Sequence, residues 1–309
     1  MRFVTYASSD GDNRVGVIAD AVVHGLDSGP SMVDLLDAGE LQTQGERALR
    51  RPAEVVELDK ALLRSPLQPR SIRDCAGFLQ HLRNVSSAID MPVDERFETF
   101  PPAYFTNPDV RFGPRDDVPM APDTEMFDFE LEIAAVIGRV GCDIPLADAE
   151  SHIAGFMVYC DWSSRDLQMK EMPLRLGPGK GKDTANTLGP ALVTPDEIEP
   201  FRSGAGYDLE MTVRVDDELV SHGRWSSIDW GFADMIAFAS RGTRLRPGDV
   251  IGSGTVESGC LFEQYVTDRQ NFRGWLQPGD DVRLAVEQLG ELRHRVVAAP
   301  TAERLSTGY

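Results

Sequence analysis

The sequence predicts an α+β protein that is mostly β, with a few helices on the outside of its sheets. Many short segments alternate apolar and polar residues, the period-2 pattern of strands with one buried face. These segments do not alternate regularly with helical patterns, which argues against a doubly wound parallel sheet. A chain of 309 residues is long enough for one large domain with a smaller second one.

The amino-terminal part has the pattern of a small β-rich unit. Residues 1–25 alternate like short strands, and residues 8–13 (SSDGDN) form a turn between two of them. Residues 31–40 and 44–51 have helical patterns, and an extended segment with two prolines follows. This segment indicates a linker near residues 60–70. We therefore expect a small domain over residues 1–66 and a main domain over residues 67–309.

The main domain is rich in strand patterns. The predicted strands span residues 129–138, 155–160, 208–217, 249–256 and 281–289, and the predicted helices span residues 147–154, 163–171 and 230–242. Pro-Gly-Asp turns precede the last two strands, at residues 247–249 and 278–280.

Composition excludes several classes of function. A formal net charge of −19 argues against a nucleic-acid partner and against an anionic membrane surface. The first twenty residues lack a signal-peptide core, and no segment approaches the ~20 apolar residues of a membrane span. The four cysteines form no Cys-x-x-Cys pair and are predicted to be reduced thiols of a cytoplasmic protein: Cys75, Cys142, Cys160 and Cys260.

Three acids interrupt the apolar run of residues 127–139 (FDFELEIAAVIGR). Glu130 and Glu132 are two residues apart on one strand face, so their side chains point the same way about 7 Å apart. Such a pair can bind one hard divalent cation. Two alternatives are an exposed acidic strand face and the paired carboxylates of a β-sandwich glycosidase. The glycosidase would need stacking aromatic residues, and only 8% of the chain is aromatic.

A second candidate region is residues 155–168 (GFMVYCDWSSRDLQ), where an apolar strand ends at Asp161. Ser163 and Asp166 have the spacing of a capping box that opens a helix. Arg165 and Gln168 then fall on one side of the first helical turns. The alternative is a structural role, with Asp161 in capping and Arg165 in a surface ion pair.

The loop of residues 176–190 (LGPGKGKDTANTLGP) is not a phosphate-binding loop, because its glycine spacing is one residue short and Asp183 replaces the usual Ser or Thr. It contains Lys180 and Lys182, two of only four lysines in the chain. A compact ammonium on such a loop indicates a charge aimed at a substrate anion, and the alternative is a flexible solvated loop.

His81 is the histidine with the most informative context, seven residues after Asp74. By itself, a histidine in this context is more often a residue on a helix surface than a general base. The segment of residues 81–100 shows no sustained helix or strand period, so we expect it to form a mobile lid.

Taken together, these residues resemble the fumarylacetoacetate hydrolase family over roughly residues 70–290. The resemblance is carried by Asp74-x6-His81, Phe129-Glu-Leu-Glu132, Asp161-Trp-Ser-Ser-Arg-Asp-Leu-Gln168, Gly181-Lys182, Ser253-Gly-Thr255 and a later Glu263. It implies a mixed β-roll catalytic domain, a small amino-terminal domain and a homodimer. It also implies Mg²⁺, Mn²⁺ or Ca²⁺ held by Glu130, Glu132 and Asp161, with Asp74 as a further ligand. The positions that match substrate contacts are Tyr104, Arg165, Gln168, Lys182 and Thr255.

Two departures from the family pattern bear on the reaction. Acylpyruvate-cleaving and oxaloacetate-decarboxylating relatives commonly pair the histidine with a glutamate three residues on, where this chain has Asn84. The partner of His81 would then be Glu263, as in the fumarylacetoacetate hydrolases. Ala185 and Asn186 replace a Gly-Thr pair typical of those hydrolases, so the resemblance does not carry their particular substrate over to this chain.

The resemblance predicts metal-assisted hydrolysis of a carbon–carbon bond in a 1,3-dicarbonyl acid, a reaction type found in aromatic compound catabolism. His81, oriented by Glu263, would take a proton from the attacking water, and Lys182 would stabilise the departing enolate. Three alternatives remain: decarboxylation of a β-keto acid such as oxaloacetate, isomerisation of a 2-hydroxydienoate, and a metal-stabilised scaffold without catalysis.

Overall fold

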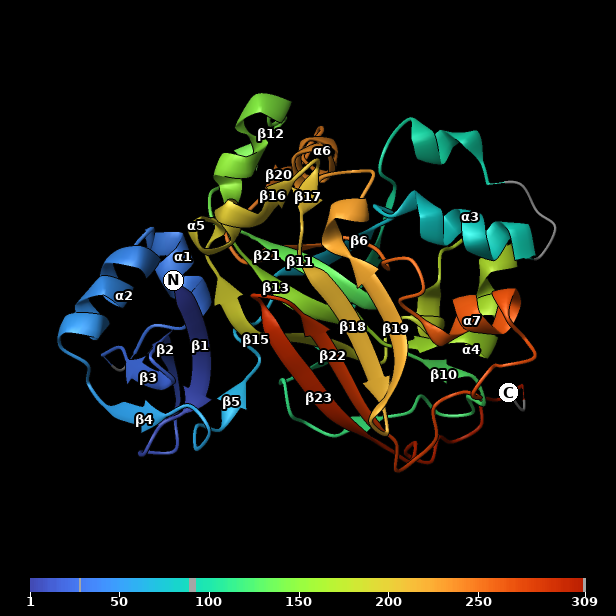
Figure 1. Ribbon diagram of the computed structural model, residues 1–309, viewed down its shortest axis with the longest axis horizontal. Coiled ribbons are helices and arrows are strands. Elements are labelled where there is room, and N and C mark those ends of the chain that lie inside the picture. Colours follow the sequence, from blue (N-terminus) through green and yellow to red (C-terminus); the bar gives the residue numbers. More distant parts are fainter. Residues whose placement is uncertain (28, 89–92, 308–309) are drawn as a thin grey trace.

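The computed structural model describes residues 1–27, 29–88 and 93–307 and has the predicted mixed α/β fold, mostly of strands (Figure 1). Its largest unit is a twelve-stranded sheet. The ten strands of its main path, in spatial order, are β4 (Val55–Glu57), β3 (Val22–Gly25), β2 (Asn13–Ala19), β1 (Arg2–Ala7), β15 (Asn186–Val193), β13 (Ile153–Asp161), β11 (Leu131–Ile137), β21 (Asp249–Gly252), β6 (Ser71–Cys75) and β7 (Ala103–Thr106). Two short strands join it at the side: β5 (Leu63–Arg64) pairs with β1, and β8 (Arg111–Phe112) pairs with β15.

The amino-terminal strands continue the sheet of the main part of the chain. β1 pairs antiparallel with β15, with Arg2 opposite Val193. The segment predicted as a linker contains β5, whose Leu63 and Arg64 pair with Tyr6 and Thr5 of β1. Figure 1 shows these amino-terminal elements, in blue, against one end of the central strands.

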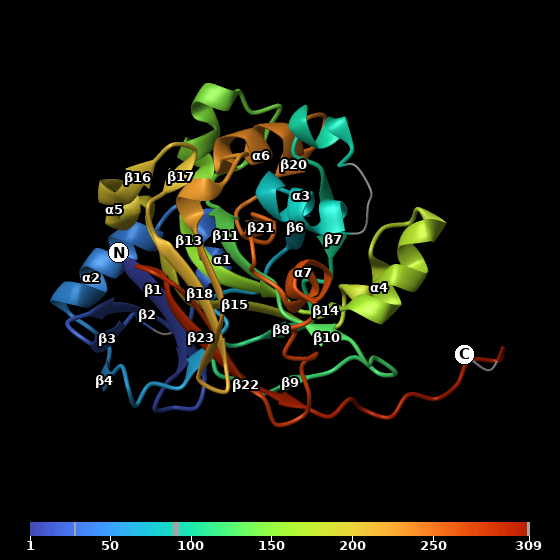
Figure 2. The same cartoon turned by 45° about the vertical axis from the view of Figure 1, so that its right-hand side comes forward.

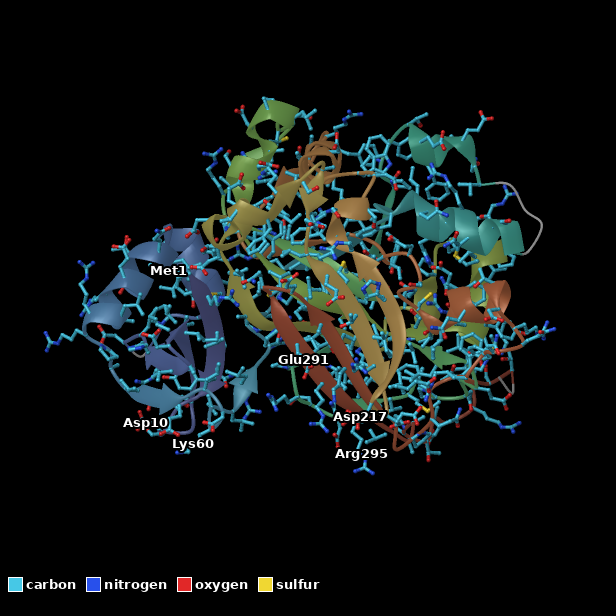
Figure 3. The ribbon with its side chains drawn as sticks, in the orientation of Figure 1. Met1, Asp10, Lys60, Asp217, Glu291 and Arg295 are labelled. Atoms are coloured by element: carbon cyan, nitrogen blue, oxygen red, sulfur yellow. The ribbon has the colours of Figure 1, made fainter. Side chains whose placement is uncertain are left out.

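A second sheet of five strands packs beside the first. Its order is β19 (Glu218–Arg224), β18 (Glu210–Val215), β22 (Asp281–Val286), β23 (Gly290–Val297) and β9 (Val118–Pro119). β23 shows why these residues form a strand, because Leu292, His294 and Val296 are buried while the residues between them are exposed. Glu291 and Arg295 project from its outer face in Figure 3.

Three two-stranded pairs complete the strands: β10 (Phe127–Asp128) with β14 (Ser163–Ser164), β12 (Gly141–Cys142) with β20 (Arg244–Leu245), and β16 (Arg202–Ser203) with β17 (Gly206–Tyr207). The α-helices are α1 (Met32–Ala38), α2 (Leu41–Arg50), α3 (Leu79–Ala88), α4 (Arg165–Glu171), α5 (Pro195–Ile198), α6 (Phe232–Ala239) and α7 (Leu261–Thr267). The 3-10 helices are η1 (Glu95–Glu98), η2 (Leu146–His152), η3 (Met172–Leu174), η4 (Gly179–Gly181), η5 (Glu199–Phe201) and η6 (Trp225–Ser227). Figure 2 shows α3, α4 and α7 gathered on the side of the molecule away from α1 and α2.

Several local predictions differ from the structure. The strand predicted over residues 129–138 is β11, which begins two residues later, at Leu131, and ends at Ile137; Phe127 and Asp128 form the separate strand β10. The helix predicted over residues 147–154 is the 3-10 helix η2, and residues 153 and 154 already belong to β13. The segment expected to be a lid, residues 81–100, begins as a regular helix, because α3 extends to Ala88. Residues 89–92 of this segment lie outside the described residues.

The predicted capping box of α4 is wrong. Ser163 and Ser164 stay extended because they pair with Asp128 and Phe127 of β10. The hydroxyl of Ser163 donates to the Asp161 carbonyl over 3.1 Å instead of capping the helix. Pairing with a distant strand therefore overrides the local capping signal, and a short-range sequence pattern carries no information about such pairing.

The four cysteines are free thiols, as predicted; Cys142 is exposed and the other three are buried. Within the described ranges, no helix combines the length and the apolar character needed to cross a membrane.

Candidate active site

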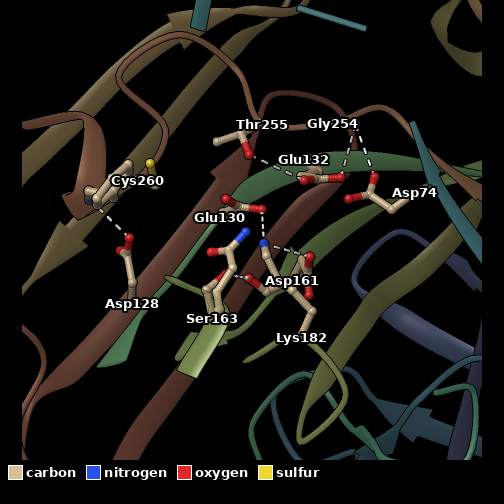
Figure 4. Close-up of polar contacts among 12 residues, drawn as sticks. Asp74, Asp128, Glu130, Glu132, Asp161, Ser163, Lys182, Gly254, Thr255 and Cys260 are labelled. Atoms are coloured by element: carbon tan, nitrogen blue, oxygen red, sulfur yellow. Dashed lines mark hydrogen bonds and ion pairs between the residues drawn. The ribbon is translucent and has the colours of Figure 1, made fainter. Parts of the chain in front are cut away.

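Four carboxylates meet near the middle of the large sheet. Asp161 ends β13, Glu132 lies in β11 and Asp74 lies in β6, while Glu130 directly precedes β11. Since β13, β11, β21 and β6 are successive neighbours in the sheet, their side chains converge (Figure 4). One oxygen from each of the four residues lies within 4.8 Å of the others. The predicted ligand set, Asp74 included, therefore forms one cluster.

All four carboxylates are buried, and Glu132 and Asp161 are 0% exposed. The interpretation of the acids as an exposed strand face is therefore wrong. Burial raises the pKa of Asp74, and burial together with the Asp74 carboxylate holds the pKa of Glu132 well above its usual range. Such crowding of like charges costs free energy unless a cation compensates it.

Two side-chain cations lie beside the cluster. The Lys182 ammonium, held after η4, contacts the Glu130 carboxylate and lies 2.8 Å from Asp161 Oδ2. Nη2 of Arg165, the first residue of α4, lies 2.8 Å from Oε1 of Glu130. Burial would raise the pKa of Glu130, but Lys182 and Arg165 outweigh it and hold that pKa well below its usual range. The predicted lysine thus points at carboxylates, and the solvated-loop alternative fails because Lys182 is buried.

A glycine turn closes the cluster from the side of β21. The Gly254 N–H group donates to Asp74 Oδ1 over 3.1 Å and to Glu132 Oε2 over 3.0 Å. Gly254 has φ +79°, and a Cβ atom there would lie 2.3 Å from the Cys75 carbonyl oxygen. Only glycine therefore fits this turn. Thr255, next in the chain, is 3.4 Å from Glu132 Oε1 through its hydroxyl.

The cluster has the chemistry of a site for a hard divalent cation. Among the described residues Asp161 Oδ1 has no hydrogen-bond partner, although it is buried. The Tyr104 hydroxyl contacts both Asp161 and Asp74, but it has one proton to donate. Buried carboxylate oxygens without enough donors are the ligands that such cations take. The residues present therefore fit a divalent cation.

A histidine–carboxylate pair lies at the side of this cluster. His81 of α3 places Nδ1 2.6 Å from Oε2 of Glu263, in the first turn of α7. Asn84 donates its amide to Oε1 of Glu263 over 2.5 Å, and the Ser258 N–H group donates to Oε2 over 2.9 Å. Asn84, where the resemblance implied a glutamate in some relatives, thus donates to the oxygen of Glu263 that His81 does not contact, which the sequence did not predict.

Asp128 is the structural residue that the sequence analysis missed. Its buried carboxylate accepts from the N–H groups of Leu261 and Phe262 at the start of α7, over 2.8 and 2.9 Å. It also accepts from Arg165 Nε over 2.8 Å. Asp128 therefore fixes both Arg165 and the helix that carries Glu263. Its only signal in the sequence was its position two residues before Glu130 in an apolar run.

These groups open onto one cavity of about 620 Å³. The predicted site residues that line it are Asp74, His81, Tyr104, Glu130, Arg165, Gln168, Lys182 and Thr255. Glu132, Asp161 and Glu263 lie behind this lining and contact it through the hydrogen bonds and ion pairs given above. Asn186 has a structural role, since it accepts from the Tyr159 hydroxyl over 2.7 Å and donates to the Asn107 carbonyl over 3.1 Å.

Comparison with known proteins agrees with this arrangement. Residues 70–297 match the sequence model described as Fumarylacetoacetate (FAA) hydrolase C-terminal. This chain belongs to the fumarylacetoacetate hydrolase family. It is 36% identical over 186 residues to the human protein named oxaloacetate tautomerase FAHD2A, mitochondrial, which covers 60% of this chain and 55% of the human one. It is 30% identical over 215 residues to a fumarylacetoacetase of Oryza sativa subsp. japonica, covering 57% and 50% of the two chains.

The chain thus spans about half the length of these curated relatives. Among solved structures, a putative HpcE protein from Mycobacterium smegmatis is 27% identical to this chain, with a TM-score of 0.76. That similarity covers 97% of this chain and 100% of the other. Members of the family generally bind a divalent metal, and this chain has a carboxylate cluster that could hold one.

Proposed function

We propose that this family member is a hydrolase that depends on a divalent cation and cleaves a carbon–carbon bond in a 1,3-dicarbonyl acid. The observation that carries the proposal is the pairing of His81 with Glu263 beside the carboxylate cluster of the same cavity. A cation held by Asp74, Glu130, Glu132 and Asp161 would act as Lewis acid and as template for the oxygens of the substrate. Mg²⁺, Mn²⁺ and Ca²⁺ are the candidates that suit such oxygen ligands.

The His81–Glu263 pair supplies the base for an attacking water. Nδ1–H of His81 donates to Glu263, which leaves Nε2 to accept a proton. Asn84 and Ser258 occupy the other hydrogen-bonding sites of the Glu263 carboxylate. The orientation of the imidazole is therefore fixed before the substrate binds, as general-base catalysis requires.

The positive groups of the cavity would stabilise the charge that develops on the substrate. Hydroxide adds to the acyl carbonyl carbon while His81 takes the proton. The bond from that carbon to the central carbon then breaks, and its electron pair stays on the 2-oxo acid as an enolate. Lys182 and Arg165 line the same cavity, and their positive charges would stabilise such an anion. His81 then returns the proton taken from water to the enolate carbon, which leaves two smaller acids as products.

A second candidate is keto–enol tautomerisation of oxaloacetate, the activity in the name of the human relative. It requires only proton transfer to and from carbon, which the His81–Glu263 pair can also perform. No water would be consumed, and no carbon–carbon bond would break.

The two candidates differ in the fate of water, so the test follows oxygen. Protein loaded with Mn²⁺ would be incubated with acetylpyruvate, or separately with oxaloacetate, in ¹⁸O-labelled water. If the protein is the hydrolase, mass spectrometry should find that acetylpyruvate gives pyruvate and acetate, with an oxygen atom from the labelled water in the acetate. If the enol absorbance of oxaloacetate is lost and acetylpyruvate gives no labelled acetate, hydrolysis is wrong and tautomerisation is supported.

A matched control comes from another histidine–glutamate pair. Nε2 of His222 lies 2.8 Å from Oε1 of Glu210 on the exposed surface, outside the cavity. His81→Ala should lower the rate of labelled-acetate formation by roughly 10² or more, whereas His222→Ala should leave that rate unchanged. If the two substitutions have equal effects on this rate, His81 is not the general base of the reaction.

A further inference from the structure

The walls of the cavity differ in character from its floor. The charged groups, including Lys182 and Arg165, lie at the carboxylate cluster. The outer walls are mostly apolar, with Phe78, Leu82, Val85, Met169, Met172 and Phe262, and they also include Ser86 and Gln168. They come from α3, α4, α7 and η3, which follows α4 directly, with Phe78 just before α3. Figure 2 shows α3, α4 and α7 on one side of the molecule. The cavity is thus polar where the head of a substrate would bind and apolar beyond it.

The cations of the cavity are already engaged at its floor. Arg165 is ion-paired with Asp128 and Glu130, each over 2.8 Å, and Lys182 with Glu130 and Asp161. Among the described residues that line the cavity, these two are the only Arg or Lys side chains. A second carboxylate at the far end of a substrate would therefore meet no cation there and mostly apolar side chains. A carboxylate that loses hydration water without gaining a partner binds less favourably, even beside the half-exposed Met169 and Met172.

The walls instead favour an apolar tail. Leu82 and Val85 are three residues apart on α3, so they face the cavity from one side of the helix. Met169 and Met172 contribute flexible, polarisable side chains that adapt to the shape of a ligand. The volume of about 620 Å³ lies within the range of sites that enclose whole small organic molecules.

We propose that the native substrate is a 2-oxo acid whose remote end is an uncharged, apolar group. This inference rests on the proposed function for the head of the substrate, and it names the class of its tail. It separates this site from sites for dicarboxylic substrates. Val85 and Met169, on opposite helices, are the residues that select the tail.

The test measures binding and does not depend on turnover. Calorimetry on the Mn²⁺-loaded protein would compare pyruvate, 2-oxooctanoate and 2-oxooctanedioate, which share one head group. Each buried methylene group contributes about fourfold in affinity. We expect 2-oxooctanoate to bind at least about tenfold more tightly than pyruvate and than the diacid. Binding of the diacid as tightly as the monoacid would overturn the inference.

The second measurement adds a positive charge to the cavity wall and compares the affinities for the monoacid and the diacid. Met169 is 49% exposed, so an arginine there can be accommodated without disturbing the core. Met169→Arg and Val85→Arg should each weaken 2-oxooctanoate and tighten 2-oxooctanedioate, because each adds a partner for the remote carboxylate. Ser87→Arg, on the exposed side of the same helix α3, is the matched control and should change neither. An unchanged order of affinities in both cavity variants would contradict the assignment of these walls.

The series also distinguishes the tail from the head. If all three acids bind and the diacid binds most tightly, the apolar tail is wrong while the proposed head site stands. If 2-oxooctanoate binds equally well without Mn²⁺, the tail is supported and the cation-dependent head is wrong. If none of the acids binds, both proposals fail.

Discussion

Nδ1 of His81 lies 2.6 Å from Oε2 of Glu263, although 182 residues separate the two in the chain. The contact joins α3 to α7, and Asn84 of α3 reaches the other oxygen of the same carboxylate. Glu263 therefore receives donors from two residues of one helix. A change of Glu263 or of Asn84 therefore alters the position of the imidazole.

The first prediction concerns this pair. His81→Ala and Glu263→Gln should each lower kcat for carbon–carbon hydrolysis by roughly 10² or more, the usual contribution of a positioned base. The double variant should be no slower than the worse single variant, because the two residues act as a unit. Steady-state kinetics of the three variants measures this. Additive losses, or robust hydrolysis without His81, would contradict the paired role.

The second prediction concerns the carboxylate cluster. Mn²⁺ at about 100 times its Kd should raise the free energy of unfolding by about 2.7 kcal/mol, because it binds the folded state alone. Glu130→Gln, Glu132→Gln and Asp161→Asn should each weaken Mn²⁺ binding tenfold or more, or about 1.4 kcal/mol. Calorimetry and thermal melts with and without Mn²⁺ provide the measurements.

Glu218→Gln, at an exposed position of β19, is the control for this experiment and should retain full Mn²⁺ affinity. Unchanged affinity in all three cluster variants would leave the cation without a site.

The third prediction compares two lysines of one loop. Lys182 is buried between Glu130 and Asp161, whereas Lys180 is 64% exposed in its ion pair with Asp183. Lys182→Met should lower the free energy of unfolding of the metal-free protein by about 3 kcal/mol, because it leaves buried carboxylates uncompensated. Lys180→Met should change it by less than about 1 kcal/mol. Chemical denaturation checks both values.

Mn²⁺ should restore part of the stability lost in Lys182→Met, since the cation replaces the missing positive charge. Equal and small losses at the two lysines would mean that the burial of Lys182 has no energetic consequence.

The fourth prediction concerns pH. Burial lowers the pKa of His294 from 6.5 to about 4, although its Nδ1–H group donates to the Asp116 carbonyl over 2.8 Å. The unfolded chain therefore binds more protons between these two values. The contribution of His294 is complete above pH 6.5 and is lost as the pH falls toward 4, by at most about 3 kcal/mol.

Denaturation curves between pH 7 and 5 test this dependence. His294→Asn keeps an amide donor but does not titrate, so its stability should fall less steeply than that of the unchanged protein over this range. Parallel curves for the two proteins would assign the acid sensitivity to other groups.

The sequence predicted those features that depend on local period or on fixed motif spacing. The alternation of residues 281–289 marked β22, and both Pro-Gly-Asp turns precede strands at glycines with positive φ, Gly248 and Gly279. The ligand set was predicted through the family motifs, and its members do converge. Spacing alone placed only Glu130 and Glu132 together, because Asp74 and Asp161 join them through the pairing order of the sheet.

The features that escaped prediction depend on contacts distant in the chain. Ser163 has the spacing of a cap, but its pairing with Asp128 keeps it extended. Asp128 itself has no function that a strand pattern could indicate, since its partners are Arg165 and backbone N–H groups of α7, all distant in the chain. The burial of Glu132 is likewise set by neighbouring strands, and alternation within β11 suggested the opposite.

The bond between Asn84 and Glu263 constrains the charge that position 84 can carry. A glutamate there would bring a second carboxylate within contact of Glu263, and the two would repel each other. As long as α7 supplies the acid, the helix that carries the histidine has to supply a neutral donor beside it.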